Sequence, residues 1–587
     1  MKKILALVLA VVLVLALFAA CGTNASNPTP APENPSTPGT PADPGTPADP
    51  DTPDTPDVPE GPYAVDEVGI AKEPYEWPLP LTEDDDTVLT YWWSTYSPQY
   101  IPADKEYGDT ELPLAIKEKT GVNVEYINVP TTSRQEAFSV LLASDDLADM
   151  MTYATAYYPG TPLQMVEDGY FANIYDYKEL MPNYLYQAKY ADPNDKATYE
   201  SVFYGDELIP VCWSMWNGAI KTDSGWGVRQ DMLEKVGMKV EDLVTWDDFH
   251  EALVAVKSAI DTVEFPMWIA SIIETNNYWQ FNSFENISVI TTIALPPVFI
   301  RDGELVMGCT SEGDRQFAEY MSGLFAEKLV NPDWQGYFFS QAFTPKTLNS
   351  ETFWQGITTT YKDTERQTVD PNCAWAPIGK PLQTADQVVH AGTVRSRTAT
   401  GNVCFAAKNT DLELSLKWVD FRFAPNGWEL YNYGPEGIVV ETLADGTRQN
   451  TEWALHNPDG IELSGLMSLY CGSRMVEAVL CTVDTQFLNP EGHFALEAID
   501  YWTEFDAKHY DRAGALPLGV RLTTEQSEEV GKYRADVITY IAESFASFLE
   551  GSKPMSEWDN YQATLDQMGL NDILAVYEEA YEDYLNK

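Results

Sequence analysis

The sequence predicts an α/β fold that is built on a parallel sheet and divided into more than one domain. From about Val88 onward, short apolar strand patterns alternate with helical patterns. Strands and helices that alternate at this spacing form βαβ units, in which the strands are parallel. The part of the chain with globular composition is about 500 residues long, and one hydrophobic core seldom extends over so many residues. We therefore expect two or more domains.

The first five elements of this body can be placed from their patterns. Gly121 is expected to end the first helix. Ligands of open α/β sheets bind beyond the carboxyl ends of the strands, where Trp92, Trp93, Tyr96 and Tyr153 are expected to lie. In chain order, the predicted elements are a strand at 87–93, a helix at 112–120, a strand at 122–127, a helix at 132–143 and a strand at 150–153.

The chain begins with the features of a secretory signal. Two lysines precede an apolar run that is too short to span a bilayer comfortably, which predicts a signal peptide at 1–20. Cys21 follows two alanines, and this arrangement resembles the cleavage site of a bacterial lipoprotein, although Phe18 stands where leucine is usual. The resemblance implies a lipid on Cys21 and a location on the outer face of the cell membrane in a bacterium without an outer membrane. An ordinary cleaved signal with an incidental cysteine is the alternative.

Residues 21–62 are expected to form a linker. They consist mainly of Pro, Thr, Asp, Gly and Ala, so they have almost no apolar surface to bury. At ~3.1 Å per residue, an extended segment of this length reaches roughly 120 Å. We interpret it as a spacer that holds the folded body away from the membrane. A disordered tail without a spacing role is the alternative.

The charge of the chain limits its partners. The chain carries 90 acidic residues, 36 basic residues and a formal net charge of −54. This charge opposes binding to nucleic acid and to anionic lipid surfaces, which leaves the lipid anchor as the predicted membrane contact. It also disfavours polyanionic substrates such as pectin or alginate, so a neutral or cationic ligand is expected. A highly solvated acidic surface explains the same composition without reference to a ligand.

Cysteines and histidines predict no metal site, and no catalytic motif is found. The cysteines after Cys21 lack CxxC pairs, which argues against a zinc site and a disulfide framework. Cys471 and Cys481 are expected to be buried free thiols, with a disulfide between them as the alternative. The segment 192–200 faintly resembles a calcium loop but lacks the glycine at its sixth position. GxSxG, HExxH and P-loop motifs are absent, so we predict neither a catalytic residue nor a cofactor.

Five motifs in order resemble the extracellular solute-binding proteins of sugar-type ABC importers. One of them, Thr-Trp-Asp-Asp-Phe, begins at Thr245, which is expected to cap a helix. The motifs lie at 141–149, 226–237, 245–249, 320–333 and 548–584.

The resemblance implies a type II periplasmic-binding-protein-like fold, in which hinge crossovers join two α/β lobes. The implied segments are 85–215 and 381–433 for lobe 1, 222–376 and 434–587 for lobe 2, and crossings near 212–225, 376–380 and 433–437.

A sugar cleft needs aromatic rings that stack on the C–H faces of the sugar and planar polar groups that bind its hydroxyls. For every aromatic candidate, the alternative to ligand contact is packing in a hydrophobic core. For Arg229 and Asp231, the alternative is an ion pair with each other. We expect Trp246, Trp418, Trp502 and Trp558 to be core residues. The ligand-binding candidates are Trp92, Trp93, Tyr96, Tyr153, Trp213, Trp216, Trp226, Arg229, Asp231, Trp279, Trp354, Tyr361, Arg395 and Glu436.

The resemblance implies a monomeric receptor that is not an enzyme. It would bind a carbohydrate, in particular an oligosaccharide, between its lobes and deliver it to the permease subunits of an ABC transporter. Two alternatives remain open. One is a secreted glycoside hydrolase with a carboxylate pair in the same cleft. The other is the same fold with a peptide or a small cationic solute as its ligand.

Overall fold

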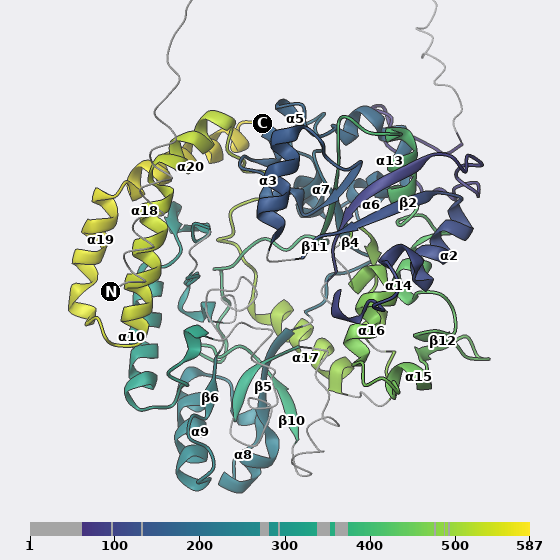
Figure 1. Ribbon diagram of the computed structural model, residues 1–587. Helices are drawn as coiled ribbons and strands as arrows, with labels where there is room; N and C mark the ends of the chain where they lie inside the picture. Colours follow the sequence, from purple (N-terminus) through teal and green to yellow (C-terminus); the bar gives the residue numbers. More distant parts are fainter. Residues whose placement is uncertain are drawn as a thin grey trace, which may run out of the picture. The chain divides into compact units, whose positions relative to one another are not determined.

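Two large sheets organise the part of the chain that the computed structural model describes (Figure 1). Cys21, the linker up to residue 61, Tyr96, Trp279 and Tyr361 lie outside the described residues. The structure describes residues 62–95, 98–130, 133–222, 224–269, 281–290, 294–336, 353–358, 374–474, 477–486, 488–490 and 494–587.

The first sheet has six strands in the described residues, and we call the part of the body around it lobe 1. All neighbouring strands are parallel except β11, which is antiparallel to β3 and to β4. The carboxyl ends of the other strands therefore lie at one edge of the sheet, as predicted for the first three of them. In spatial order the strands are β14 (Leu480–Cys481), β4 (Cys212–Trp216), β11 (Thr398–Phe405), β3 (Met150–Thr152), β1 (Val88–Trp93) and β2 (Asn123–Asn128).

Ten α-helices surround this sheet among the described residues. The first ends at Gly121, as predicted, because Gly121 adopts a left-handed φ of 73° and a Cβ atom there would lie 2.3 Å from the carbonyl oxygen of Thr82. A small hairpin of β12 (Val440–Thr442) and β13 (Arg448–Asn450) also belongs to this part. The helices are α2 (Glu111–Thr120), α3 (Arg134–Ser144), α4 (Ala154–Tyr157), α5 (Pro162–Glu167), α6 (Pro182–Lys189), α7 (Lys196–Val202), α13 (Leu412–Asp420), α14 (Trp428–Tyr433), α15 (Glu452–Leu455) and α16 (Leu463–Tyr470).

The second sheet has four described strands, and we call the part around it lobe 2. β5 is antiparallel to both of its neighbours, whereas β6 is parallel to β9. In spatial order the strands are β10 (Trp375–Ile378), β5 (Ser224–Arg229), β9 (Trp354–Thr358) and β6 (Met267–Trp268).

Of the described helices of lobe 2, α9, α10 and α18 begin with a capping box. Thr245 accepts a hydrogen bond from the backbone of Asp248, whose carboxylate accepts one from the backbone of Thr245, so the predicted cap is confirmed. A hairpin of β7 (Val298–Arg301) and β8 (Glu304–Met307) lies beside these helices. The helices are α8 (Gln230–Val236), α9 (Trp246–Ala259), α10 (Glu312–Ala326), α17 (Phe494–His509), α18 (Thr524–Leu549), α19 (Trp558–Gln567) and α20 (Leu570–Leu585).

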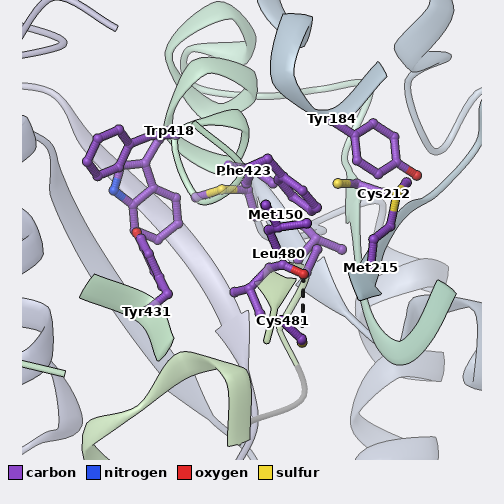
Figure 2. Close-up of a cluster of buried hydrophobic side chains, with 14 of the residues drawn as sticks. Met150, Tyr184, Cys212, Met215, Trp418, Phe423, Tyr431, Leu480 and Cys481 are labelled. Carbon is purple, nitrogen blue, oxygen red and sulfur yellow. Dashed lines mark hydrogen bonds between the residues drawn. The ribbon is translucent and has the colours of Figure 1, made fainter. Parts of the chain in front are cut away.

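Each lobe has its own hydrophobic core. Figure 2 shows part of the lobe 1 core, in which Met150 of β3, Met215 of β4, Trp418 of α13 and Leu480 of β14 lie close together. The lobe 2 core joins its sheet to α9, α10, α18, α19 and α20. The four tryptophans that were predicted to be core residues are all buried, which confirms that prediction.

The boundaries between the lobes differ from those implied by the family resemblance. β14 pairs with β4, and apolar residues up to Leu488 pack in the lobe 1 core, so 434–488 belongs to lobe 1 rather than lobe 2. Conversely, Leu382 and Val389 pack against Tyr510, which places the start of the segment 381–433 with lobe 2. A pairing between strands so distant in sequence leaves no local signal in the amino-acid pattern.

Three crossings between the lobes follow from these pairings in the described chain. The first, at 217–223, joins β4 to β5 and agrees with the position expected for it. The second lies at 392–397, before β11, and the third begins at 482, after β14, and leads to α17. The crossings expected near 376–380 and 433–437 were therefore wrong.

α17 packs against β5, which follows the first crossing, and against β10 of the lobe 2 sheet (Figure 1). Trp502 covers Gly225, where a Cβ atom would lie 2.4 Å from the indole ring. Phe505 covers Gly379 in the same way, at 2.1 Å from its ring. Glycine at both positions therefore lets α17 approach the backbone of the lobe 2 sheet closely. We call this region the α17 contact.

A contact between the lobes, the Glu200 contact, lies outside the crossings. Tyr584 of α20 donates a hydrogen bond to Glu200 of α7 (2.7 Å), and the backbone N–H of Gly519 donates another (3.2 Å). Arg521 donates to the backbone carbonyl of Glu200, and its guanidinium lies 3.3 Å from the ring centroid of Tyr204. Polar groups therefore dominate this contact.

Residues 62–86 precede β1 and pack on lobe 1. The indole N–H of Trp77 donates to Asp420 (2.8 Å), and Lys189 forms an ion pair with Asp66 (2.7 Å). Both carboxylates are buried, so these bonds fix the segment to helices of lobe 1.

Candidate functional site

The three crossings meet at a pocket of about 300 Å³, which we call the hinge pocket. This volume is at the lower end of the range for ligand pockets. Ile220, Val394 and Val483, one from each crossing, supply apolar surface. The polar and aromatic side chains that line the pocket are Trp216, Asn217, Lys221, Arg395, Ser396 and Thr398.

The sheet topology explains why these residues converge. β4 ends at Trp216 and β11 begins at Thr398, and the two strands are antiparallel, with Thr398 opposite Met215. The pocket therefore lies at the edge where the parallel strands of lobe 1 have their carboxyl ends. This edge is where open α/β sheets bind ligands.

Arg395 is held firmly at the wall of the pocket. Its Nη1 donates to Thr222 Oγ1 (2.9 Å) and to Asp506 Oδ2 (3.1 Å), and its Nη2 donates to the carbonyl of Lys221 (2.9 Å). These partners come from the first crossing and from α17, so the guanidinium joins two of the chain segments that form the hinge.

Asp506 is the centre of a buried charge cluster behind the pocket. Its carboxylate accepts a hydrogen bond from Lys380 Nζ (2.6 Å) and also pairs with Arg395 and Arg512. Burial opposes ionisation of this carboxyl, but Lys380 and Arg512 outweigh burial and lower the pKa of Asp506 to about 2. One carboxylate therefore neutralises part of the charge of three cations.

Four of the predicted ligand-binding tryptophans are core residues instead. Trp93 stacks on Tyr107 with ring centroids 3.7 Å apart, and its N–H donates to the buried carboxylate of Glu477 (2.7 Å). Trp92 packs in a neighbouring apolar cluster, while Trp226 and Trp354 pack against each other in the lobe 2 core. Protein atoms cover all four, because strand-end aromatics that face a core have the same local sequence pattern as those that face a ligand.

Three other candidates, Arg229, Asp231 and Glu436, have structural roles in the described residues. Arg229 is buried and forms a double hydrogen bond with Asp231 (2.6 and 2.7 Å), which is the mutual pairing that stood as the alternative. Glu436 lies on the surface beside the β12–β13 hairpin, where it accepts hydrogen bonds from the backbone N–H (2.6 Å) and hydroxyl (3.1 Å) of Thr442. These contacts stabilise local structure outside the hinge pocket.

The structure brings two of the predicted residues, Trp216 and Arg395, to the hinge pocket. Trp213 is half-buried and packs between two clusters of lobe 1, and half-buried Tyr153 directly follows β3. Tyr96, Trp279 and Tyr361 lie outside the described residues, so their roles remain predictions.

Sequence reasoning missed several polar residues of the pocket and its surroundings. Asn217 directly follows Trp216, and Ser396 and Thr398 lie close to Arg395 in the sequence. Their positions next to two predicted candidates could have identified them as pocket residues. Asp506 had no such signal, because it lies 111 residues from Arg395 and 126 residues from Lys380.

The described residues contain no group of three or more His, Cys, Asp or Glu side chains that could hold a metal ion. In the segment that faintly resembles a calcium loop, Asp195 caps α7 through Thr198 and accepts a hydrogen bond from Arg397 (2.8 Å). The cysteines at 212, 309, 404, 471 and 481 are buried, and none of these five forms a disulfide bond in the described part of the chain, as predicted for 471 and 481. None of the described helices combines the length and apolarity that crossing a membrane requires.

A family model described as bacterial extracellular solute-binding protein matches residues 98–345. This match covers less than half of the chain, and that part is similar to the bacterial extracellular solute-binding proteins. The chain is 23% identical over 194 residues to the fructooligosaccharide ABC transporter substrate-binding protein FusA of Streptococcus pneumoniae. That match spans 32% of this chain and about a third (34%) of the relative's length.

Solved solute-binding proteins share the fold. An HMO-binding, ABC-transporter-associated protein of Bifidobacterium longum infantis matches with a TM-score of 0.65 and 17% identity over 85% of this chain and 99% of its own. FusA in complex with kestose matches with a TM-score of 0.62 and 17% identity, over 85% of this chain and 100% of FusA. The N-glycan transport protein NgtS of Streptococcus pneumoniae matches with a TM-score of 0.56 and 13% identity. This match covers 85% of the present chain and 99% of NgtS. These likenesses confirm the predicted two-lobe fold.

Proposed function

We propose that this solute-binding protein is a receptor that binds a carbohydrate, in particular an oligosaccharide, between its lobes and delivers it to an ABC permease. The observation that carries the proposal is the match of its fold to nearly the whole length of HMO-binding, kestose-bound and N-glycan transport proteins. A match of this length includes the hinge as well as both lobes.

The hinge pocket has the chemistry that a sugar requires. The indole of Trp216 offers an aromatic face for sugar C–H groups, and Asn217, Ser396 and Thr398 offer partners for hydroxyls. Because all three crossings line the pocket, a ligand bound there contacts the segments that set the angle between the lobes. Binding would therefore shift the population toward one lobe arrangement, which the permease would recognise.

Binding is favoured over hydrolysis. A glycosidase of the usual kind needs two carboxyl groups that flank the scissile bond. The described residues that line the hinge pocket include neither Asp nor Glu. This composition favours a receptor over an enzyme.

We further propose that the protein is a lipoprotein. Cys21 would carry the lipid on the outer face of the cell membrane, and the linker behind it would let the body reach a permease in the same membrane. The lipid would be the sole membrane contact of a monomeric receptor. Mass spectrometry of the membrane-associated protein tests this proposal, because a lipidated Cys21 at its N-terminus is the expected result and an unmodified N-terminus would contradict it.

A thermal-shift screen of the purified secreted chain tests the carbohydrate proposal. The panel contains neutral and acidic oligosaccharides, short peptides and small cationic solutes, and we expect an oligosaccharide to raise the melting temperature. Chromatography of the bound sugar after long incubation should show no cleavage. A shift with a peptide or a cationic solute but with no sugar would refute the carbohydrate assignment.

Variants of Trp216 then test the pocket. Trp216→Ala should weaken sugar binding about tenfold or more, because the stacking surface is lost, and Trp216→Phe should retain most of the affinity. Trp453→Ala is the matched control, since Trp453 lies half-exposed on α15 away from the pocket. If the Trp216→Ala variant and the control bind the sugar with equal affinity, the sugar site does not lie in the hinge pocket.

A further inference from the structure

We infer that the ligand carries an acidic group, such as a uronate carboxylate or a sugar sulfate, which the Lys221 and Arg395 side of the hinge pocket binds. This inference rests on the proposed carbohydrate-binding function and specifies its substrate class. An acidic group on a short oligosaccharide fits the charge and size of the pocket better than a long polyanion does.

The charge of the pocket is opposite to the charge of the chain. Acidic residues outnumber basic ones by 90 to 36 in the whole sequence. The described pocket lining nevertheless contains two cations, Lys221 and Arg395, and no acid. The net charge of −54 had led us to expect a neutral or cationic ligand, but charges beyond about 10 Å are largely screened at 0.1 M salt. The nearby cations therefore determine what the pocket attracts.

The charge cluster behind the pocket adds to its positive potential. Asp506 is shared among Lys380, Arg395 and Arg512, so three cations face one carboxylate there. Burial lowers the pKa of Lys380 to about 8, and Arg512 and Arg395 push it in the same direction against the attraction of Asp506. Buried charges of one sign are poorly screened by solvent, so their field extends into the adjoining pocket.

Lys221 is placed to contact the acidic group directly. Its Nζ pairs with Asp500 Oδ1 (3.1 Å), and the two side chains are 38% and 52% exposed. Exposed ion pairs of this kind contribute little to stability, so the ammonium can exchange Asp500 for a ligand oxygen at small cost. Arg395 is fixed by its three protein partners and contributes a permanent charge beside it.

The remaining lining fits the neutral part of such a ligand. Trp216 and the hydroxyls of Ser396 and Thr398 suit the ring and hydroxyls of the sugar that bears the acid. The surface of the chain as a whole repels a long polyanion, whereas a single acidic sugar is enclosed by the cationic wall. The substrate class that follows is a short oligosaccharide with an anionic residue.

Calorimetry with matched sugar pairs tests the inference. The pairs are trigalacturonate with the neutral galactotriose of the same linkage, and a sulfated trisaccharide with its unsulfated parent. We expect at least one acidic member to bind at least tenfold more tightly than its neutral partner at low salt, and its affinity to fall as salt rises. The two pairs distinguish carboxylate from sulfate.

Lys221→Gln locates the site. It should weaken binding of the acidic member about tenfold and weaken binding of its neutral partner by a clearly smaller factor. Lys105→Gln is the matched control, because Lys105 pairs with Glu111 at similar exposure outside the pocket and should leave both affinities unchanged.

The outcomes separate the inference from the proposed function. Equal or tighter binding of the neutral members would overturn the acidic-ligand inference and leave carbohydrate binding intact. Tight binding of an acidic sugar that Lys221→Gln does not weaken would overturn the assignment to this pocket. Binding of a peptide with no sugar of either kind would instead refute the proposed function itself.

Discussion

The α17 contact, which lies within lobe 2 beside the crossings, and the Glu200 contact between the lobes differ most in how much water reaches them. At the α17 contact, the side chains of Asp506 and Lys380 are 4% and 6% exposed. At the Glu200 contact, Glu200 is mostly covered, but its ion-pair partner Lys196 is 71% exposed. The comparison suggests a permanent joint on one side and a separable contact on the other.

The physical reason is the cost of leaving a charge without its partner. Breaking a buried ion pair leaves a charge that water cannot reach, which is strongly unfavourable. At an exposed pair, water replaces the lost partner and the cost is small. We therefore expect the lobes to rotate about the α17 contact and to part at the Glu200 contact.

The largest expected effect comes from breaking the joint itself. Asp506→Asn removes the carboxylate that Lys380, Arg395 and Arg512 share, and should lower the free energy of unfolding by about 3–5 kcal/mol in urea denaturation. Asp500→Asn on the same helix is the control, because its exposed pair with Lys221 should contribute less than about 1 kcal/mol. Equal losses in the two variants would contradict the comparison.

Acid should weaken the ion pairs of Asp506 at the α17 contact, whereas buried apolar contacts do not titrate. The pKa of Asp506 is about 2 in the folded protein and 3.8 without its partners, so its stabilisation is present above pH 3.8 and is lost as pH falls toward 2. That loss amounts to about 2 kcal/mol. Denaturation between pH 6 and pH 2 should show a shallower fall for Asp506→Asn than for the wild type.

Part of the acid dependence should survive in that variant. Burial opposes ionisation of Asp66, but Lys189 and Tyr190 lower its pKa to about 2 as well, so it contributes in the same pH range. A fall of wild-type size in the Asp506→Asn variant would mean that Asp506 is not the carboxylate that titrates.

The close approach of α17 gives an intermediate effect. Gly225→Ala places a Cβ atom 2.4 Å from the ring of Trp502, which should lower the free energy of unfolding by about 1–3 kcal/mol. Gly323→Ala in α10 meets no atom within 4 Å, and should instead stabilise the protein by about 0.5–1 kcal/mol. Thermal unfolding of both variants measures the difference, and a neutral Gly225→Ala would show that α17 moves away easily.

Breaking the Glu200 contact should change the stability of the protein least and the separation of the lobes most. Glu200→Ala removes the acceptor of Tyr584 and Gly519, and should cost about 1 kcal/mol while raising the radius of gyration of the ligand-free protein in X-ray scattering. Glu413→Ala is the control, because its pair with Lys417 also joins residues four apart on one helix, but within lobe 1. An unchanged radius would mean that the Glu200 contact does not hold the lobes together.

Sequence reasoning succeeded where the determinants of structure are local. The strands at 87–93 and 122–127, the end of the first helix at Gly121 and the cap at Thr245 each depend on residues within a few positions of one another. The family motifs, read in order, supplied the two-lobe fold that no single pattern contains.

The hinge could not be derived in the same way. The place of β14 beside β4, and the convergence of Lys380 and Arg395 on Asp506, join residues more than 100 positions apart. Trp93 and Trp216 have similar aromatic neighbours in the sequence, yet one stacks inside a core and the other lines a pocket. Only the packing of distant elements decides between these outcomes.

The attachment of residues 62–86 to lobe 1 has a mechanical consequence. Any pulling force that enters through the preceding chain is carried by the bonds of Asp66 with Lys189 and of Trp77 with Asp420. Both bonds attach the segment to lobe 1. A force on the preceding chain is therefore transmitted to lobe 1 and not directly to the crossings between the lobes. If the chain is anchored through Cys21 as we propose, lobe 1 can be held under tension while lobe 2 moves.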